Sequence, residues 1–381
     1  MEIKAKTGRI KIRTSALRAY TMVGSLVLIW LFFHWQTGSI FLTPRNLSNL
    51  MLQTSVTGII AIGMLMVIVS GNIDLSVGSM LALAGGVGAI CLTNLGYGLV
   101  PSLLIAIAVG LAIGFLQGFL TAYASIPAFI VTLGGLLAWR GAIKGISESE
   151  TIPVTDASFK AIGQNYLAPE LGWVLAAIAI GLVLYAAVRR SKVKKEYGLE
   201  EGRIGTELLK AFLPIAGIVG FILVMNAYAG IPVPVLIFLA VALVGLFITT
   251  NTTFGRYIYA IGGNAEAARL SGINNKAVVM MVFAILGAFT GIAALIYTAR
   301  VASASPDAGS LLELDAIAAC VIGGTSLMGG RGTVFGACLG ALIMSSLDNG
   351  MSLLNLQDYV QELIKGSILV AAVGVDMVGA K

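Results

Sequence analysis

One long apolar stretch constrains the fold of this chain more than any other feature. From Asn46 to Trp139 the sequence contains a single charged side chain, that of Asp74. The apolar runs in this stretch have the length of about 20 residues that a helix needs to cross the hydrocarbon core of a bilayer. In lipid the backbone must satisfy its own hydrogen bonds, and continuous apolar runs of this length do so as helices. The sequence therefore predicts an all-α, polytopic bundle of membrane-spanning helices.

Asp74 lies within the segment Gly71–Ser79, whose glycines and serines predict that the preceding helix breaks there. A carboxylate at membrane depth is costly unless water or a partner stabilises its charge. Non-helical backbone at that depth is tolerated only where protein or a water-filled cavity satisfies its amides. Two interpretations therefore remain open. Either the break lies beside a permeation pathway, or it is a short aqueous turn in which Asp74 caps the next helix.

Further apolar runs extend this pattern over the whole chain. Only 11% of the residues are charged, far below the roughly 25% of a soluble domain. We expect one transmembrane domain over residues 20–381, preceded by a basic tail at 1–19. The short segment Glu313–Leu327 is either a thin crossing or a re-entrant element, so about 11 or 12 spans are expected. The other expected spans are Tyr20–Gly38, Leu50–Ser70, Ser76–Leu95, Val100–Tyr123, Ala128–Gly145, Leu171–Ala187, Ala211–Tyr228, Val235–Thr250, Ala277–Thr298, Val334–Leu347 and Tyr359–Met377.

Glycine patterns add two expectations about packing. Gly110, Gly114 and Gly118 recur at intervals of four residues, and such a stripe lets the backbones of two helices approach closely. Apolar runs are interrupted around Gly71–Ser79 and again around the glycine-rich stretch Gly323–Gly332. Transporters built from inverted repeats have interrupted segments in corresponding halves, so these two stretches are candidates for a matching pair.

Positively charged residues predict the orientation of the chain in the membrane. They gather in the N-terminal tail and in the loops 188–210 and 251–276, whereas the loop after the fifth span is rich in acidic residues. Cytoplasmic loops carry an excess of Lys and Arg, so we expect the tail and both basic loops in the cytoplasm. The net charge of +6 comes from loops between apolar runs and therefore does not indicate binding to nucleic acid.

Motifs for catalysis are missing from the sequence. No Gly-Lys dipeptide occurs, so the chain lacks the phosphate-binding loop of P-loop NTPases. No Gly-x-Ser-x-Gly or His-Glu-x-x-His pattern occurs either. The three cysteines and the single histidine have no metal-ligand spacing. We therefore expect no catalytic residue, no metal site and no cofactor in this chain.

The most informative polar stretch lies in the loop 251–276. Residues Asn264–Leu270 are rich in alanine, which favours a short helix. Asn264 is a suitable N-cap for this helix, and Gly272 is a suitable C-cap. Such a helix on the cytoplasmic side either docks another protein or lies as an ordinary amphipathic helix on the membrane surface.

Three stretches together resemble the permease subunits of bacterial ATP-driven importers. The pattern Glu-Ala-Ala-x-x-x-Gly at Glu266–Gly272 resembles the loop motif that fits a groove on the ATPase of such importers. Together with Gly71–Ser79 and Glu313–Ser326, it is similar to the monosaccharide branch of the family, which includes ribose, arabinose and xylose permeases. Two extra spans and the basic loop Arg189–Lys210 resemble the xylose type most.

This resemblance implies a transport subunit in the bacterial inner membrane, with a cytoplasmic N-terminus. It implies a homodimer that works with a cytoplasmic ATPase, which uses ATP and Mg²⁺, and with a periplasmic or extracellular sugar-binding protein. The sugar, D-xylose or a related pentose, would cross by alternating access. The expected pathway residues are Asn72, Asp74, Ser76, Gln53 and Thr54, and the expected ATPase-coupling residues are Gly255, Arg256, Asn264, Glu266, Ala267, Ala268, Arg269 and Gly272.

A second hypothesis is a secondary transporter that couples sugar to protons or sodium through Asp74. It predicts further buried carboxylates that line a cavity shared with Asp74. Intramembrane carboxylates of this kind are typical of proton and ion relays. The candidates in the second half of the chain are Glu313, Asp315, Asp348, Glu362 and Asp376.

Overall fold

The structure is a computed structural model that describes residues 14–197 and 204–379. Most of the predicted basic tail at 1–19, and residues 198–203 of the predicted loop 188–210, lie outside the described residues. The helices are α1 (Thr14–Gln36), α2 (Pro44–Val69), α3 (Val77–Thr93), α4 (Leu99–Ala122), α5 (Ala128–Ile146), α6 (Ala157–Gln164), α7 (Pro169–Glu196), α8 (Ile204–Asn226), α9 (Val233–Asn251), α10 (Thr253–Gly263), α11 (Ala265–Leu270), α12 (Asn275–Val301), α13 (Leu312–Ile322), α14 (Val334–Leu353) and α15 (Asp358–Gly379).

Among the described residues, eight helices are long and apolar enough to cross a membrane. They belong to α2, α4, α5, α7, α8, α9, α12 and α14, and the shorter apolar helices Thr21–Gln36 and Val77–Thr93 fall on the first and third predicted spans. The prediction of an all-α, polytopic membrane bundle is therefore confirmed. The two remaining predicted segments correspond to α13, which has 11 residues, and to α15.

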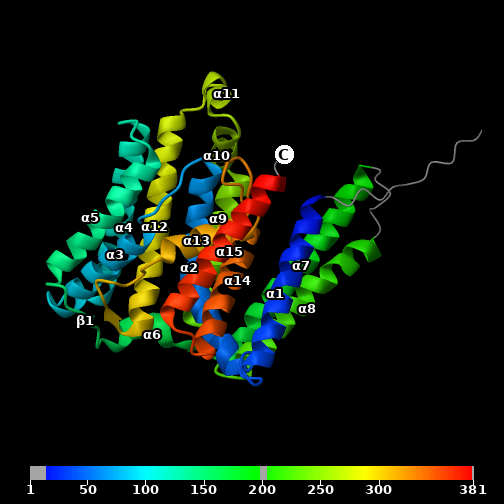
Figure 1. Cartoon of the computed structure of the whole chain (residues 1–381). Helices are drawn as coiled ribbons and strands as arrows, with labels where there is room; N and C mark the ends of the chain where they lie inside the picture. The colour runs from blue at the N-terminus through cyan, green and yellow to red at the C-terminus, as the bar shows by residue number, and fades with distance from the viewer. Residues whose placement is uncertain (1–13, 198–203, 380–381) are drawn as a thin grey trace, which may run out of the picture.

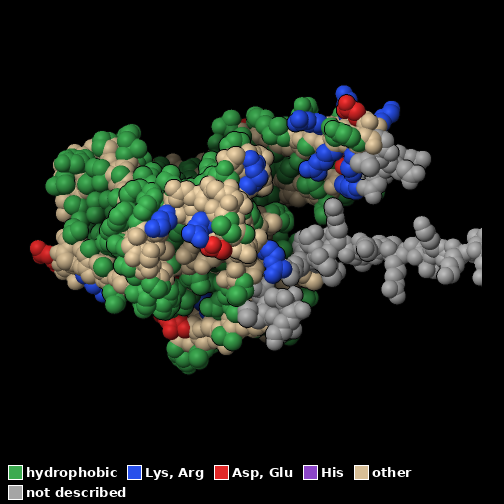
Figure 2. All heavy atoms as spheres, turned by 90° about the horizontal axis from the view of Figure 1, so that it is seen from above, with side chains coloured by type: hydrophobic (Ala, Val, Ile, Leu, Met, Phe, Trp, Pro, Cys, Tyr) green, Lys and Arg blue, Asp and Glu red, His purple; other side chains and the backbone are tan. Residues whose placement is uncertain are grey.

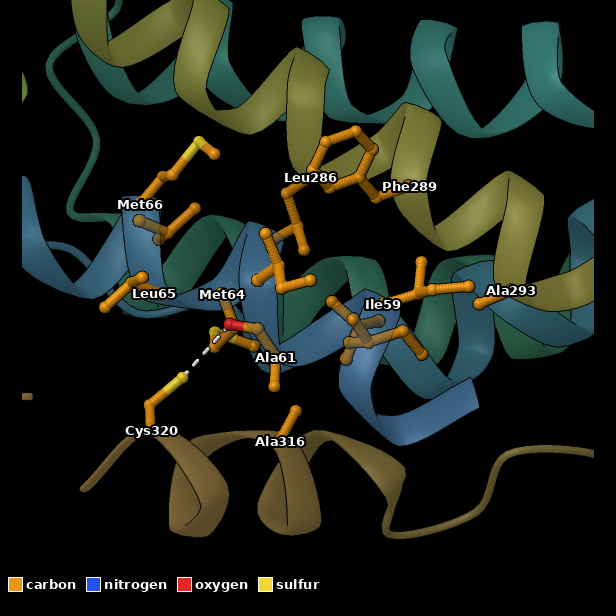
Figure 3. Close-up of a cluster of buried hydrophobic side chains, with 14 of the residues drawn as sticks. Ile59, Ala61, Met64, Leu65, Met66, Leu286, Phe289, Ala293, Ala316 and Cys320 are labelled. Carbon is orange, nitrogen blue, oxygen red and sulfur yellow. Dashed lines mark hydrogen bonds between the residues drawn. The ribbon is translucent and has the colours of Figure 1, made fainter. Parts of the chain in front are cut away.

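Helix α2 lies at the centre of the largest hydrophobic cluster. Its side chains are buried almost throughout, and they pack between α12 and α13 (Figure 3). Met64 and Leu65 are fully buried there, and the thiol of Cys320 in α13 donates to the carbonyl of Ala61 at 3.2 Å. Helices in lipid associate through close packing of this kind, because lipid tails are as apolar as the side chains.

The predicted glycine stripe of α4 packs against α12. A Cβ atom at Gly110 would collide with the backbone of Gly287, and one at Gly114 would collide with the backbone of Phe283. The expectation that this stripe serves close helix packing is therefore confirmed.

The loops divide between two ends of the bundle (Figure 1). Helix α11, the last residues of α7, the first residues of α8 and the end of α15 lie at one end, here called the α11 end. Helix α6 and strand β1 lie at the other end, here called the α6 end. Loops that the charge pattern predicts on the same side of the membrane thus lie at the same end of the molecule.

Two short strand pairs tie loops together at the α6 end. Strand β1 (Ile152–Pro153) pairs with β4 (Ser303–Ala304), and β2 (Tyr166–Leu167) pairs with β3 (Ile231–Pro232), both antiparallel. Each pair joins the loop after α5 or α6 to a distant part of the chain. The strands therefore fix the outer loops without adding a sheet to the bundle.

The segment between α12 and α14 crosses the bundle. It begins with β4 at the α6 end, whereas at the α11 end the amide of Gly330 donates to the carbonyl of Val69 at 2.9 Å. The hydroxyl of Tyr259 in α10 donates to the carbonyl of Gly332 at 2.9 Å. Helix α13 itself covers only about 17 Å of a core that is about 30 Å thick, and non-helical backbone covers the rest. The open question about Glu313–Leu327 is thus answered in favour of a broken crossing.

Candidate functional site

Two helices begin inside the bundle and meet there. Helix α2 ends at Val69 at the α11 end, and a non-helical segment, residues 70–76, leads back into the bundle to the start of α3. Non-helical backbone likewise leads from the α6 end to the start of α13. The two starts touch, because a Cβ atom at Gly78 would collide with the carbonyl oxygen of Gly309 and the carboxylate of Glu313.

This meeting point confirms the predicted break at Gly71–Ser79, and the chain is also non-helical over the predicted stretch Gly323–Gly332. The segment that meets Gly71–Ser79 is 302–311, before α13, whereas the glycine-rich stretch Gly323–Gly332 lies after α13 at the α11 end. Broken helices whose N-termini meet near the middle of the bundle are typical of transporter substrate sites.

Asp74 is fully buried at the start of α3. Its Oδ1 accepts hydrogen bonds from the amide and from the hydroxyl of Ser76, each at 2.7 Å. When the amide of Gln117 is oriented to satisfy its neighbours, its nitrogen donates to Asp74 Oδ2 at 3.1 Å and its oxygen accepts from Trp139 Nε1 at 3.0 Å. Asp74 therefore closes an Asx turn just before α3, whose N-cap residue is Ser76, and through Gln117 it ties this turn to α4 and α5.

Two other predicted pathway residues make only local contacts. Asn72 is half-buried, and its Nδ2 donates to the hydroxyl of Ser70 at 3.1 Å. Thr54 is buried, and its hydroxyl donates to the carbonyl of Leu50 in its own helix at 2.8 Å. The structure thus brings Asn72, Asp74 and Ser76 together in one break but places Thr54 elsewhere.

A polar cavity of about 350 Å³ lies between α2, α12, α14 and the segment that leads into α13. Gln53 is the predicted pathway residue that lines it. The Oε1 atom of Gln53 is buried and has no hydrogen-bond partner among the described residues. The lining residues are Gln53, Val56, Thr57, Tyr297, Arg300, Asp307, Gly309, Ser310, Leu312, Asp315, Ser345, Asp348 and Ser352.

An ion triplet that the pathway prediction missed borders this cavity. Lys365 Nζ of α15 lies 3.1 Å from Asp315 Oδ2 of α13 and 2.8 Å from Asp348 Oδ1 of α14. A buried charge must be compensated to be tolerated, and the single ammonium lies between the two carboxylates and compensates one of their two negative charges. The only sign in the sequence is that all three residues are charged and lie in apolar surroundings. Their pairing joins three different helices and cannot be read from spacing.

The ion-coupled hypothesis predicts carboxylates that share a cavity with Asp74. Asp315 and Asp348 do share a cavity, but Asp74 does not line it. Glu313 lies at the start of α3 instead, against Gly78. Glu362 is exposed, and the side chain of Asp376 lies outside the described part of the chain.

Two basic residues of α5 hold one wall of the cavity. Arg140 Nη1 donates to the carbonyls of Pro306 and Ala308 at 2.6 and 2.7 Å. Lys144 forms an ion pair of 3.0 Å with Asp307. The segment that leads into α13 is therefore fixed by side chains from α5 as well as by strand β4.

The predicted helix in the loop 251–276 is present as α11. Asn264 caps it, because its side chain accepts from the amide of Ala267 at 2.9 Å. Gly272 follows the helix with a φ of 84°, a conformation that glycine adopts at little cost. Both predicted caps are therefore confirmed.

Helix α11 presents an exposed surface at its end of the molecule. The side chains of Glu266 and Arg269 are exposed and paired at 2.7 Å, and Leu270 is 78% exposed. Ala268 is buried on the opposite face. Gly255 is buried at the start of α10, whereas Arg256 is exposed. Seen from this end, Lys and Arg side chains are far more extensive than Asp and Glu (Figure 2).

Comparisons with known proteins agree on one kind of relative. Residues 46–373 match the family described as "Branched-chain amino acid transport system / permease component". The chain is 45% identical over 364 residues to the xylose transport system permease protein XylH of Escherichia coli K12, which covers 94% of this chain and 92% of that protein. It is 44% identical to XylH of Haemophilus influenzae over 96% of this chain and 98% of that protein. It is 37% identical to the ribose import permease protein RbsC of Escherichia coli K12 over 88% of this chain and 87% of that protein. No solved structure matches the chain significantly.

Proposed function

Since this chain belongs to the family of branched-chain amino acid transport system permease components, we propose that it is the membrane subunit of an ATP-driven sugar importer. The sugar is D-xylose or a related pentose. The support for the substrate is the similarity to XylH proteins over nearly the whole length of both chains, which exceeds the similarity to RbsC. The proteins it resembles are transport permeases rather than enzymes, so the chain is a transport subunit.

The observation that carries the coupling part of this proposal is α11. It is a helix capped at both ends, it lies at one end of the bundle, and it exposes the apolar side chain of Leu270. An exposed helix with an apolar tip suits a groove on another protein. The partner is an ATPase that binds ATP and Mg²⁺, and α10, α11 and their flanks contain all of the predicted coupling residues.

Helix α10 offers a route from the ATPase to both broken crossings. Gly262 in α10 lies so close to the carbonyl of Val69 and the amide of Gly330 that a Cβ atom would not fit. Val69 is the last residue of α2, and Gly330 belongs to the segment after α13. A displacement of α11 would therefore reach the end of α2 and the end of the α13 crossing together. Alternating access would follow from the movement of these two crossings.

The predicted pathway residues divide into three roles in this proposal. Gln53 contacts the sugar, because it lines the polar cavity. Asp74 and Ser76, together with Asn72, hold the break before α3 in shape. Thr54, which bonds to its own helix, serves helix packing.

The assembly that we propose is a homodimer of this chain in the bacterial inner membrane. The α11 end faces the cytoplasm together with the N-terminus, in agreement with the basic side chains on that end (Figure 2). The sugar-binding protein docks at the α6 end, on loops that the two strand pairs hold in place.

The test is uptake of labelled pentoses and hexoses into vesicles that contain this chain, with the candidate ATPase and binding protein added or omitted. We expect ATP-dependent uptake of D-xylose only when all three proteins are present. Uptake by this chain alone, driven by an ion gradient, would establish the ion-coupled hypothesis and overturn the importer.

A further inference from the structure

The polar cavity has the composition of a site for a small neutral ligand. Its volume of about 350 Å³ lies near the lower limit of small-molecule sites, which range from about 300 to 1,000 Å³. Hydroxyl, amide and carboxylate groups line it together with the Tyr297 ring and the side chains of Val56 and Leu312. A monosaccharide presents the same combination, with hydroxyl groups around its ring and apolar C–H faces.

The charges around the cavity favour a neutral ligand over an ion. Asp307 is paired with Lys144, and Asp315 and Asp348 are paired with Lys365. With Arg300 these bases balance the three acids, so the cavity offers an anion no net positive charge. A cation between the carboxylates of Asp315 and Asp348 would compete with the ammonium of Lys365, which already lies within 3.1 Å of both. Hydroxyl groups can donate to the carboxylate oxygens without displacing this ammonium.

Two helices provide matching polar faces that lead to the cavity. Asn49, Gln53 and Thr57 follow one another at intervals of four on α2, and Ser345, Asp348 and Ser352 lie on one face of α14. Residues at these intervals share a face of a helix. On α2 the side chains change from exposed to half-buried to buried in chain order, and on α14 they do so in reverse order. Both polar faces thus run inward from the α6 end.

A second cavity lies at the start of these faces. It has a volume of about 460 Å³, and Asn49 and Arg45 line it together with Tyr166 and Tyr228. The two tyrosine rings lie edge to face with their centroids 5.9 Å apart. Aromatic rings beside amide and guanidinium groups offer a sugar both an apolar surface and hydrogen bonds.

We propose that the cavity around Gln53, Asp315 and Asp348 binds a neutral monosaccharide, which enters from the α6 end past Tyr166 and Tyr228. The buried Oε1 of Gln53, which lacks a partner among the described residues, accepts from one sugar hydroxyl. The oxygens of Asp315 and Asp348 that do not contact Lys365 accept from others. The identity of the sugar rests on the proposed function. The cavity itself is formed by residues of this chain, so binding can be tested without the partner proteins.

Thiol labelling tests the site on the isolated chain. Cys91, Cys320 and Cys338 are replaced by alanine, and Ser345→Cys is introduced at the buried end of the cavity. We expect D-xylose to slow the reaction of this cysteine with a small methanethiosulfonate reagent at least threefold. If Ser345→Cys does not react, the labelling rate of Ser352→Cys, at the exposed end of the cavity, is measured with and without D-xylose instead. Leu270→Cys, at the far end of the molecule, is the control whose rate should not change.

The outcomes of the labelling separate the alternatives. Protection by D-xylose and not by sodium chloride supports the proposal. Protection by sodium chloride and not by D-xylose would show a cation site, and protection by neither would show that the cavity binds no sugar. Either of these last two results overturns the proposal.

Uptake by the complete system provides the second test. Asp348→Asn leaves a one-to-one pair of Lys365 and Asp315, and Gln53→Met keeps the length of the side chain. Each should reduce uptake at limiting D-xylose roughly tenfold, the effect of one lost hydrogen bond to the ligand. Ser345→Ala should also reduce uptake, whereas Ser55→Ala, a buried serine that bonds to Met51 of its own helix, should not.

These results distinguish a failed site from a failed function. If the wild-type system imports D-xylose and all cavity variants do so at the same rate, the site is wrong and the importer stands. If the wild-type system imports no pentose, the proposed function is wrong, and the labelling of the isolated chain still decides whether the cavity binds a monosaccharide.

Discussion

Asp74 shows how a charged residue can be retained inside a membrane protein. The carboxylate is fully buried, but Ser76 donates to one oxygen and Gln117 to the other. Hydrogen bonds to a charged group are worth more than those to a neutral one, and they make burial of the charge tolerable. Asp74, the single charged residue between Asn46 and Trp139, therefore stabilises the turn before α3.

Replacing Asp74 separates its structural role from a role of its charge. Asp74→Ala removes the acceptor of the Ser76 amide and hydroxyl and one acceptor of the Gln117 amide, so the free energy of unfolding should fall by roughly 2–4 kcal/mol. Asp74→Asn keeps an acceptor for Ser76 and should lose less stability. Thermal denaturation in detergent measures both. If Asp74→Asn is as stable as the wild type but transports no sugar, the charge itself takes part in transport.

At the scale of helices, the contact between the starts of α3 and α13 fixes where these two broken helices lie relative to each other. Gly78 has no space for a side chain, because the Gly309 carbonyl and the Glu313 carboxylate occupy that position. Each broken helix thus limits where the other can begin. The pair behaves as one structural unit, although its parts are far apart in the sequence.

Gly78→Ala should disrupt this unit. The added methyl group forces the two helix starts apart, and overpacking of this kind typically costs 1–3 kcal/mol. We expect a lower yield of folded protein and a lower denaturation midpoint. Gly134→Ala is the matched control, because a Cβ atom at Gly134 has no neighbour within 4 Å. Equal stability of the two variants would contradict the tight contact.

The exposed tip of α11 allows a separate test of coupling between this chain and the ATPase. Leu270→Ala removes an exposed side chain, so the fold should remain intact, but sugar-stimulated ATPase activity of the assembled importer should fall about tenfold, as for an interface hot spot. Leu243→Ala in α9, where Leu243 is 67% exposed, is a control on a surface suited to lipid. Normal ATPase stimulation in Leu270→Ala would argue against α11 as the docking helix.

The elements show which parts of this structure can be predicted from the sequence. The spans follow from apolar length, and the caps of α11 follow from Asn264 and Gly272, because these signals are local. The hydrogen bond between Asp74 and Gln117 joins α3 to α4, and the ion triplet joins three helices. Such partners are set by tertiary packing and have no fixed spacing in the sequence. The same reason explains why the contact of the break before α13 with Gly71–Ser79 cannot be predicted from the sequence.

At the scale of the whole molecule, the broken crossing at α13 leaves the start of α1 and the end of α15 at the same end of the bundle (Figure 1), the end that we propose faces the cytoplasm. The loops at the α6 end should then be reachable from outside and those at the α11 end should not. Glu150→Cys should react with an impermeant thiol reagent in intact cells. Lys195→Cys and Leu270→Cys should react only after permeabilisation, because positively charged loops remain in the cytoplasm.

The unsubstituted chain gives the background for this labelling, since Cys91 and Cys320 are buried and Cys338 is half-buried. Reaction of Lys195→Cys from outside would reverse the orientation. Reaction of Lys195→Cys and Leu270→Cys from opposite sides would show that the two loops do not share a side, and the arrangement of the crossings would have to change.

The glycine seam between α4 and α12 has a mechanical consequence. The two backbones interlock at Gly110, Gly114 and Gly287 with no side chain between them, so these helices cannot slide past each other without a collision. In any transport cycle, α4 and α12 therefore have to move together as one rigid body.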